Sequence, residues 1–139
     1  MFNVFDTTLN IIILNENSIM ETVKIILQII VGLGILNVWL LRFNSSTTYR
    51  GGNAGSMKEE FKAYGLPENL VYLVGFVKIT LAIMLLVGIW IESLVDPAAI
   101  GMAAMMLGAI IMHLKIRDSF KQTLPAITLL IICGIIIWL

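Results

Sequence analysis

Lys78 is the residue of this sequence whose type and position best suit chemistry, because its amine lies in the middle of an otherwise apolar run from Leu70 to Ile91. A run of about 20 apolar residues is long enough to cross a lipid bilayer. A lysine at the centre of a spanning helix costs roughly 2.5–3.5 kcal/mol to insert, so we expect it to face other helices and to have a polar partner. Such an amine can bind a ligand, hold a proton or serve as a structural contact.

Other polar side chains are expected at the depth of Lys78, as judged from a helix rise of about 1.5 Å per residue. Asn37 lies near the corresponding end of the first apolar run, and His113 lies at the end of the third run, level with Tyr72. Glu60 can reach the same region from the polar segment that precedes the second run. The predicted ligand-binding cluster therefore consists of Lys78, Asn37, His113, Tyr72 and Glu60.

Each of these residues also has a purely structural interpretation, and the sequence leaves both open. Lys78 can be a paired structural lysine or can extend its amine to the membrane surface. Asn37 can join helices by hydrogen bonds, and His113 can lie at the membrane interface beside Lys115. A single histidine argues against a haem held by two histidines and against a zinc site. With one cysteine, Cys133, the chain can form neither an intramolecular disulfide nor a CxxC pair.

The composition is that of an integral membrane protein. Of the 139 residues, 59 % are hydrophobic and 13 % are charged, whereas soluble domains carry about 25 % charged residues. The missing charge is expected to be lipid-facing surface, so the lipid bilayer is the first predicted partner. A net charge of zero gives no indication of a nucleic-acid partner. One domain, residues 1–139, is expected, and the start lacks the basic residues of a cleaved signal peptide.

Four long apolar segments predict an all-α fold, a four-transmembrane-helix bundle. A short amphipathic helix is expected between the first two spans, because Ser56 and Glu59 have the spacing of a capping box and Gly65 can end a helix. The expected spans cover residues of about 18–43, 67–91, 97–114 and 119–139, with a polar connection at 44–66 and an N-terminal segment at 1–19.

The later spans carry their own start and packing signals. Asp96 and Pro97 are suited to the N-cap and first position of the third span. Ser119 and Gln122 repeat the capping-box spacing at the start of the fourth. Small residues let helices approach closely, and those expected to do so are Gly75, Gly101, Ala104 and Gly108.

Lysine and arginine are distributed unevenly between the connections. They are frequent in the first connection and in the third, residues 115–118, whereas the second holds only the acidic Glu92 and Asp96. Cytoplasmic loops carry an excess of Lys and Arg. Connections 44–66 and 115–118 are therefore predicted to be cytoplasmic, and both termini are predicted to lie outside.

The polar connection contains two distinctive motifs, Tyr49-Arg50-Gly51-Gly52 and Ala63-Tyr64-Gly65-Leu66-Pro67. The spans contain more generic ones, Tyr72-Leu73-Val74-Gly75 before Lys78 and Met106-Leu107-Gly108-Ala109 before His113. Together they resemble the DoxX-like family of small four-helix membrane proteins, over residues of about 25–139. The resemblance implies a multi-pass protein of the bacterial cytoplasmic (inner) membrane. It also implies roles that differ between members, from a subunit linked to quinone-dependent oxidation to an assembly chaperone, so it selects no single function.

Three functional hypotheses follow. The first, which the sequence favours, is a non-catalytic subunit or assembly partner of a membrane complex, such as a quinone-linked oxidoreductase, or a homo-oligomer. The second is a quinone- or lipid-binding bundle with Lys78 and Asn37 as polar contacts in an apolar pocket. The third is a small enzyme or proton-coupled transporter in which Lys78 titrates, although broken helices and inverted repeats are lacking. No cofactor motif is evident, so a quinone is the cofactor to expect in a redox role.

Overall fold

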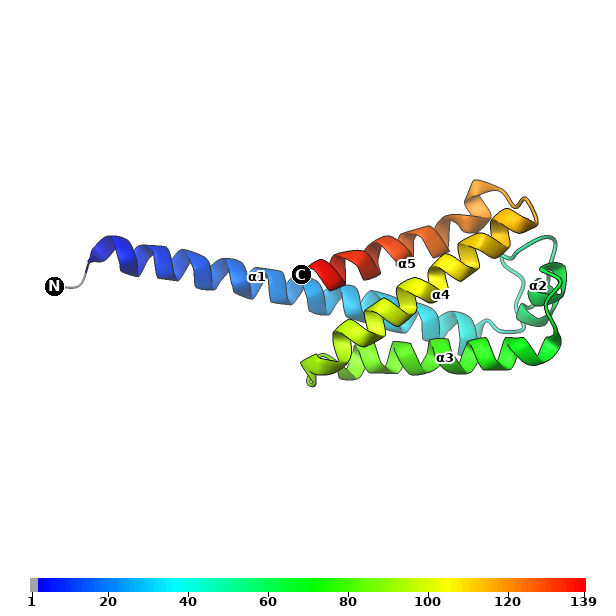
Figure 1. The fold of residues 1–139 in the computed structure, drawn as a ribbon, viewed down its shortest axis with the longest axis horizontal. Coiled ribbons are helices and arrows are strands. Elements are labelled where there is room, and N and C mark those ends of the chain that lie inside the picture. Colours follow the sequence, from blue (N-terminus) through cyan, green and yellow to red (C-terminus); the bar gives the residue numbers. More distant parts are fainter. Residues whose placement is uncertain (1–2) are drawn as a thin grey trace.

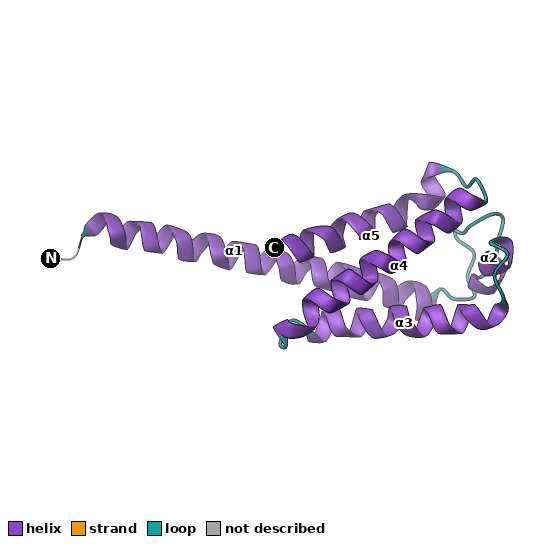
Figure 2. Ribbon diagram, viewed as in Figure 1, coloured by secondary structure: helices purple, strands orange, loops and turns teal. Residues whose placement is uncertain are grey.

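The computed structural model describes residues 3–139, and every regular element in that range is a helix (Figure 2). Four helical segments are long and apolar enough to cross a membrane, which confirms the predicted all-α bundle with a short helix between its first two spans. The elements are α1 (Val4–Leu36) continued by the π-helix η1 (Asn37–Leu41), α2 (Met57–Ala63), α3 (Glu68–Val87), the 3-10 turn η2 (Glu92–Leu94), α4 (Val95–Lys115) and α5 (Phe120–Trp138).

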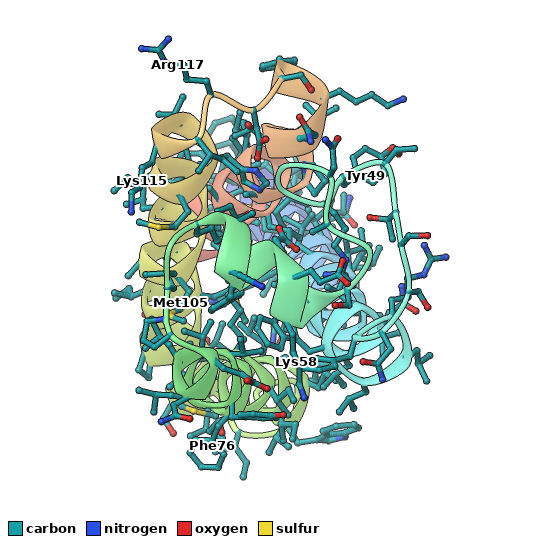
Figure 3. All side chains as sticks on the ribbon, turned by 90° about the vertical axis from the view of Figure 1, so that its right-hand side faces the viewer. Tyr49, Lys58, Phe76, Met105, Lys115 and Arg117 are labelled. Carbon is teal, nitrogen blue, oxygen red and sulfur yellow. The ribbon has the colours of Figure 1, made fainter. Side chains whose placement is uncertain are left out.

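Consecutive spans run in alternating directions (Figure 1). α2 and the connection between α4 and α5 lie at one end of the bundle, and the turn between α3 and α4 lies at the other. Seen from the first end, α2 lies across the bundle in front of the spans (Figure 3). The two connections that are rich in lysine and arginine therefore share one end of the molecule, as the alternation of four spans requires.

The first helix begins at Val4, so it extends well before the expected start of the first span near Ser18. Asn3 caps the helix, because its side-chain oxygen accepts a hydrogen bond from the N–H of Phe5 at 3.2 Å. The sequence from residue 4 to residue 31 contains neither glycine nor proline, so nothing interrupts the helix there. α1 and η1 together comprise 38 residues, or about 57 Å at the helical rise, against about 30 Å for the hydrocarbon core of a bilayer.

Local capping signals set both ends of α2, as predicted. Ser56 accepts a hydrogen bond from the N–H of Glu59 at 3.2 Å, and the helix is followed by Gly65 in the left-handed region at φ 78°. The apolar face of this segment is buried, and it consists of Met57, Phe61 and Tyr64. α2 therefore packs onto the end of the bundle through one face and leaves the other exposed.

The predicted start of α5 is correct, and the predicted start of α4 is wrong. Ser119 and Gln122 form the expected capping box at the start of α5. α4, however, begins at Val95 directly after η2, so Asp96 and Pro97 lie within its first turn and Asp96 is not the N-cap. Proline is tolerated in a first turn because the N–H groups there have no partner inside the helix.

Small residues serve the packing of the spans at three places. A methyl group on Gly75 would lie 2.8 Å from the ring of Trp39, and one on Gly101 would lie 2.9 Å from Leu81. Gly32 likewise gives room to a side chain of α3. The three small residues of α4 that were expected to pack do not form one buried surface. Two of them, Ala104 and Gly108, are exposed.

Candidate functional site

A cavity of about 630 Å³ lies at the α2 end of the bundle, a volume within the usual range of ligand sites, about 300–1,000 Å³. Its walls come from η1, α3, α4 and α5 and from the connection that contains α2. The cavity is partly open to the outside. The lining is mostly apolar and includes Trp39, Phe61, Val74, Met105, Met106, Met112 and Leu129.

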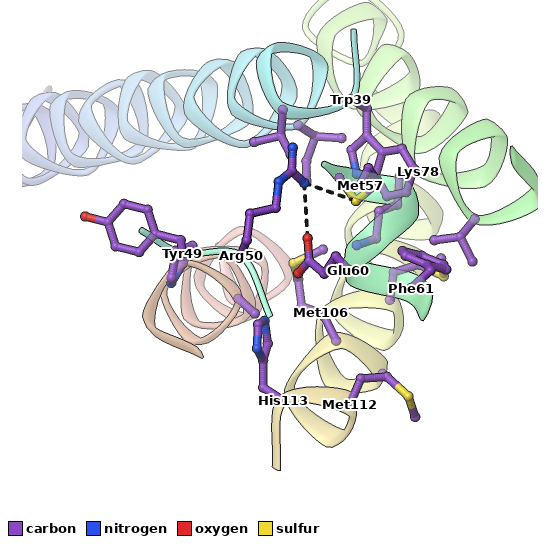
Figure 4. Close-up of a pocket in the computed structure, with 18 of the residues that line it drawn as sticks. Trp39, Tyr49, Arg50, Met57, Glu60, Phe61, Lys78, Met106, Met112 and His113 are labelled. Atoms are coloured by element: carbon purple, nitrogen blue, oxygen red, sulfur yellow. Dashed lines mark hydrogen bonds and ion pairs between the residues drawn. The ribbon is translucent and has the colours of Figure 1, made fainter. Parts of the chain in front are cut away.

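Lys78 projects from the middle of α3 and lines this cavity (Figure 4). Its ammonium nitrogen lies 5.4 Å from the centre of the Trp39 ring, within the range of a cation–π interaction. Lys78 forms no hydrogen bond or salt bridge with any part of residues 3–139. Every side-chain nitrogen or oxygen in that range that is cut off from solvent has a partner. The unpaired ammonium therefore borders open space.

The ring of Trp39 is positioned by the π-helical turn at the end of the first span. The N–H of Arg42 donates to the carbonyl of Asn37 at 3.0 Å, five residues earlier. Trp39 is 6 % exposed, rests on the bare backbone at Gly75 and meets the ring of Phe61 edge-on at 6.1 Å between centroids. Such π-turns recur at functional sites, and this one places an aromatic face beside the lysine.

Arg50 and Glu60 form a buried ion pair on the wall of the cavity, with Nη1 and Oε2 separated by 3.1 Å and side chains 4 % and 11 % exposed. Arg50 also donates to the sulfur of Met57 at 3.4 Å (Figure 4). It donates further to the backbone carbonyls of Arg42 and Ser45. One guanidinium thus ties α2 to the segment that leaves the first span, and its charge is fully compensated.

A second group of hydrogen bonds continues from the other oxygen of Glu60. The hydroxyl of Tyr64 donates to Glu60 Oε1 at 2.6 Å and lies 3.3 Å from Nε2 of His113. Nδ1 of His113 lies 2.7 Å from Asp118, which also accepts from the backbone N–H of Gly52 at 2.9 Å. Burial, followed by the charge of Glu60, raises the pKa of the Tyr64 phenol far above its ordinary value. Tyr64 is therefore a permanent donor.

These residues form a connected set, here called the paired cluster and defined as Arg50, Glu60, Tyr64, His113 and Asp118. It links α2, the end of α4, the connection between α4 and α5, and the segment before α2. Each carboxylate in it faces a cation or a hydrogen-bond donor. The stability of such a network depends on every polar group having a partner, because an unpaired buried polar group is costly.

The structure brings most of the predicted site residues to the cavity. Lys78, Glu60 and His113 line it, and Asn37 does so from an exposed position. Tyr72 does not: it is 55 % exposed and stacks on the outside of the bundle. It precedes Lys78 by six residues, which at about 100° per residue turns it roughly 240° around the helix. An equal depth in the membrane therefore does not bring Tyr72 to the cavity.

Three members of the paired cluster were not among the predicted site residues: Arg50, Tyr64 and Asp118. A signal existed for Tyr64, which follows Glu60 by four residues on one helix and so shares its face. Asp118 reaches His113 because Arg117 adopts a left-handed backbone conformation, φ 57°. No local sequence pattern predicts this conformation. Glu59, as expected, is used near a helix start, where it accepts from the N–H of Gly55 at 2.7 Å.

The site combines hydrogen-bond donors with a mostly apolar lining. Within residues 3–139, no three side chains of His, Cys, Asp or Glu gather in a way that could hold a metal ion. The ammonium of Lys78 can donate to a carbonyl, carboxylate or phenolate oxygen. The aromatic and methionine side chains around it can contact an apolar body.

Comparison with known proteins gives one match. The sequence model of the DoxX-like family matches residues 35–135, which include η1, α2, α3, α4 and most of α5. The chain therefore belongs to the DoxX-like family, as its motifs had indicated. No curated protein and no solved structure matches the chain.

Proposed function

We propose that this DoxX-like membrane protein binds a small apolar molecule with a hydrogen-bond-accepting or anionic head group, and that Lys78 is the contact to that group. An isoprenoid quinone is the first candidate ligand, and a lipid with an acidic head is the second. The observation that carries the proposal is the unpartnered ammonium of Lys78 on the wall of an apolar cavity. This is the second of the sequence-based hypotheses, and the geometry supports it better than the first.

The charges of the site explain why Lys78 needs a ligand. Glu60 lines the same cavity, but its two oxygens are already bonded to Arg50 and Tyr64. Lys78 is only partly buried, but a charge that is withdrawn from water without a partner is disfavoured. A ligand oxygen that accepts from Lys78 would recover about 1.5–3 kcal/mol, the usual value of a hydrogen bond to a charged group, and this corresponds to roughly 10- to 150-fold in affinity.

The apolar lining explains why the ligand should have a flat or flexible apolar body. Trp39 and Phe61 offer aromatic faces on one side of the cavity, and offset stacking on such faces is favourable for a ring. Met105, Met106 and Met112 line the α4 side, and methionine adapts its shape to irregular partners. The partial opening of the cavity would allow an apolar tail to extend into the bilayer.

The proposal is tested by extracting the protein gently from its own membrane and identifying what it carries. Native mass spectrometry gives the bound mass, and analysis of an organic extract distinguishes a quinone from a lipid. We expect a bound apolar molecule that is lost in Lys78→Met and kept in Lys62→Met, a control at an exposed lysine. Equal retention in both variants would contradict the proposal. So would a stoichiometric second protein in the absence of any small molecule.

The subunit or assembly role and the enzyme or transporter role stay hypotheses, and the extraction experiment tests the subunit or assembly role. We also propose that the α2 end faces the cytoplasm of a bacterial cell, with both termini on the other side. The lysine and arginine residues of the two connections at that end support this orientation.

A further inference from the structure

The first half of α1 stands apart from the rest of the molecule. Every residue from 3 to 23 is exposed, and the first partly buried side chain is Lys24. This part of the helix continues beyond the C-terminal end of α5 (Figure 1), over about 30 Å for 20 residues. Its exposed large apolar side chains are Val4, Phe5, Leu9, Ile11, Ile12, Ile13, Leu14, Ile19, Met20 and Val23.

Apolar side chains recur along this helix with the spacing of a coiled coil. Steps of four and three residues alternate from Phe5 to Leu9 and Ile12, and from Ile19 to Val23. Glu16 is the one polar residue at a position of this series. The series continues within the bundle through Ile26, Ile30 and Leu33. A period of 3.5 residues sustained over about four heptads is the pattern of helices that pair along a seam.

The face opposite the seam supports this interpretation. It is mostly polar, with Val4, Ile11 and Leu14 as exceptions, and its polar members are Asn3, Thr7, Asn10, Asn17, Ser18, Glu21 and Lys24. Such a division between an apolar seam and a polar back is expected of a helix that pairs in water. Here it extends beyond the part of α1 that lies beside the bundle.

The seam also points away from the protein's own bundle. α1 contacts the other spans through the side chains of Gln28, Val31 and Ile35, which are at most 3 % exposed. The seam residues at the same level, Ile26 and Ile30, are 51 % and 47 % exposed. A partner helix can therefore lie along the whole of α1 without displacing α3 or α5.

We propose that α1 pairs with α1 of a second copy of this chain, as a parallel coiled coil with the two bundles on its outer sides. Two copies in one bilayer have the same direction and the same depth. Identical seams then meet residue for residue, as an isologous contact requires. At Gly34, which borders the seam residue Leu33, an added methyl group would meet no atom within 4 Å, so the helices have room to approach. This inference is independent of the ligand proposed for the cavity.

Cysteine cross-linking in native membranes tests this pairing. Cys133→Ala first removes the natural thiol, and single cysteines are then introduced at matched heights. A disulfide forms only where Cα atoms come within about 7 Å, so cross-linking reads the seam directly. The seam positions are Leu9, Ile12 and Ile19, and the control positions on the opposite face are Thr7, Asn10 and Asn17.

We expect a disulfide-linked homodimer when the cysteine is at any of the three seam positions. At the three control positions, the yield of cross-linked dimer should fall to background. Equal cross-linking on both faces, or none on either, would overturn the proposal, as would cross-links to a different protein. All of residues 3–23 are exposed, so these substitutions are expected to leave the bundle intact. As a second variant, Ile12→Asp together with Ile19→Asp should abolish the dimer in native mass spectrometry while retention of the cavity ligand stays unchanged. A dimer that survives this double substitution contradicts the seam.

Discussion

Two polar regions border the same cavity, and they differ in how completely their hydrogen bonds and ion pairs are formed. In the paired cluster, Arg50 forms an ion pair with Glu60, Nδ1 of His113 lies 2.7 Å from Asp118, and Tyr64 joins the two pairs. Lys78, on the neighbouring wall, has no hydrogen bond or salt bridge to residues 3–139. The complete network holds chain segments together, whereas the incomplete one has an open donor. The difference separates polar groups whose hydrogen bonds are saturated within the chain from one donor that remains open for the proposed ligand.

The largest effect should come from breaking the complete side of this comparison. Arg50→Met leaves Glu60 buried without its cation and three backbone carbonyls without their donor. Loss of one partner of a buried pair typically costs about 3–5 kcal/mol. Thermal unfolding of the purified protein in lipid should show this loss, with Arg42→Met at an exposed position as the control. Equal stability of the two variants would mean that the paired cluster does not hold α2 in place.

Lys78→Met should have the opposite effect on stability. Removal of a charge that has no partner should leave the ligand-free protein at least as stable as the original, because the cost of burying that charge is removed. Affinity for an added quinone should fall by roughly 10- to 150-fold, as expected for the loss of about 1.5–3 kcal/mol. Unfolding without ligand and a binding titration check the two halves. Strong destabilisation of the ligand-free variant would place Lys78 among the structural residues.

Asp118→Asn tests the outer end of the paired cluster. The amide keeps an oxygen for the N–H of Gly52 but removes the charge opposite His113. A cost of about 1–3 kcal/mol is expected, less than for Arg50. Hydrogen exchange should quicken in the segment around Gly52 before it quickens in α3. If exchange rises evenly over the bundle, the effect is global and the cluster has no separate outer end.

The smallest effect concerns the proton of Tyr64, whose pKa is raised by burial and by Glu60. A tyrosine normally ionises near pH 10, so Tyr64 should contribute no phenolate there while the protein is folded. The rise in phenolate absorbance through pH about 10 should therefore be equal in the original protein and in Tyr64→Phe. Above the ordinary pKa the unfolded chain loses this proton and the folded chain keeps it, so stability should decrease as pH rises. A smaller absorbance rise in Tyr64→Phe would show that Tyr64 is accessible to base.

Much of the fold could be predicted because its signals are local. Ser56, Gly65 and Ser119 mark helix ends by their own side-chain or backbone properties, and the four apolar runs mark the spans. The start of α1 was missed because Ser18, although a good cap, lies within a segment that has no helix breaker. A cap residue alone does not begin a helix when the preceding sequence can continue it.

The candidate site was only partly predictable, because it depends on rotation and on irregular backbone. The depth of Lys78 and His113 followed from counting, and both line the cavity. Tyr72 does not line the cavity, because it lies on another side of α3 than Lys78. The approach of Trp39 to Lys78 depends on a π-turn, and that of Asp118 to His113 depends on the left-handed Arg117. Neither irregularity leaves a local signature in the sequence.

The central claim, that Lys78 is the polar contact for a ligand in the cavity, is tested most directly through the fluorescence of Trp39. The other two tryptophans, Trp90 and Trp138, are 80 % and 82 % exposed and can be replaced by phenylalanine. Quinones quench indole fluorescence at contact, so a titration with quinone in lipid reports occupancy beside Lys78. The account predicts saturable quenching that shifts to at least about tenfold higher quinone concentration in Lys78→Met. Superimposable curves with and without Lys78, or quenching that never saturates, would contradict it.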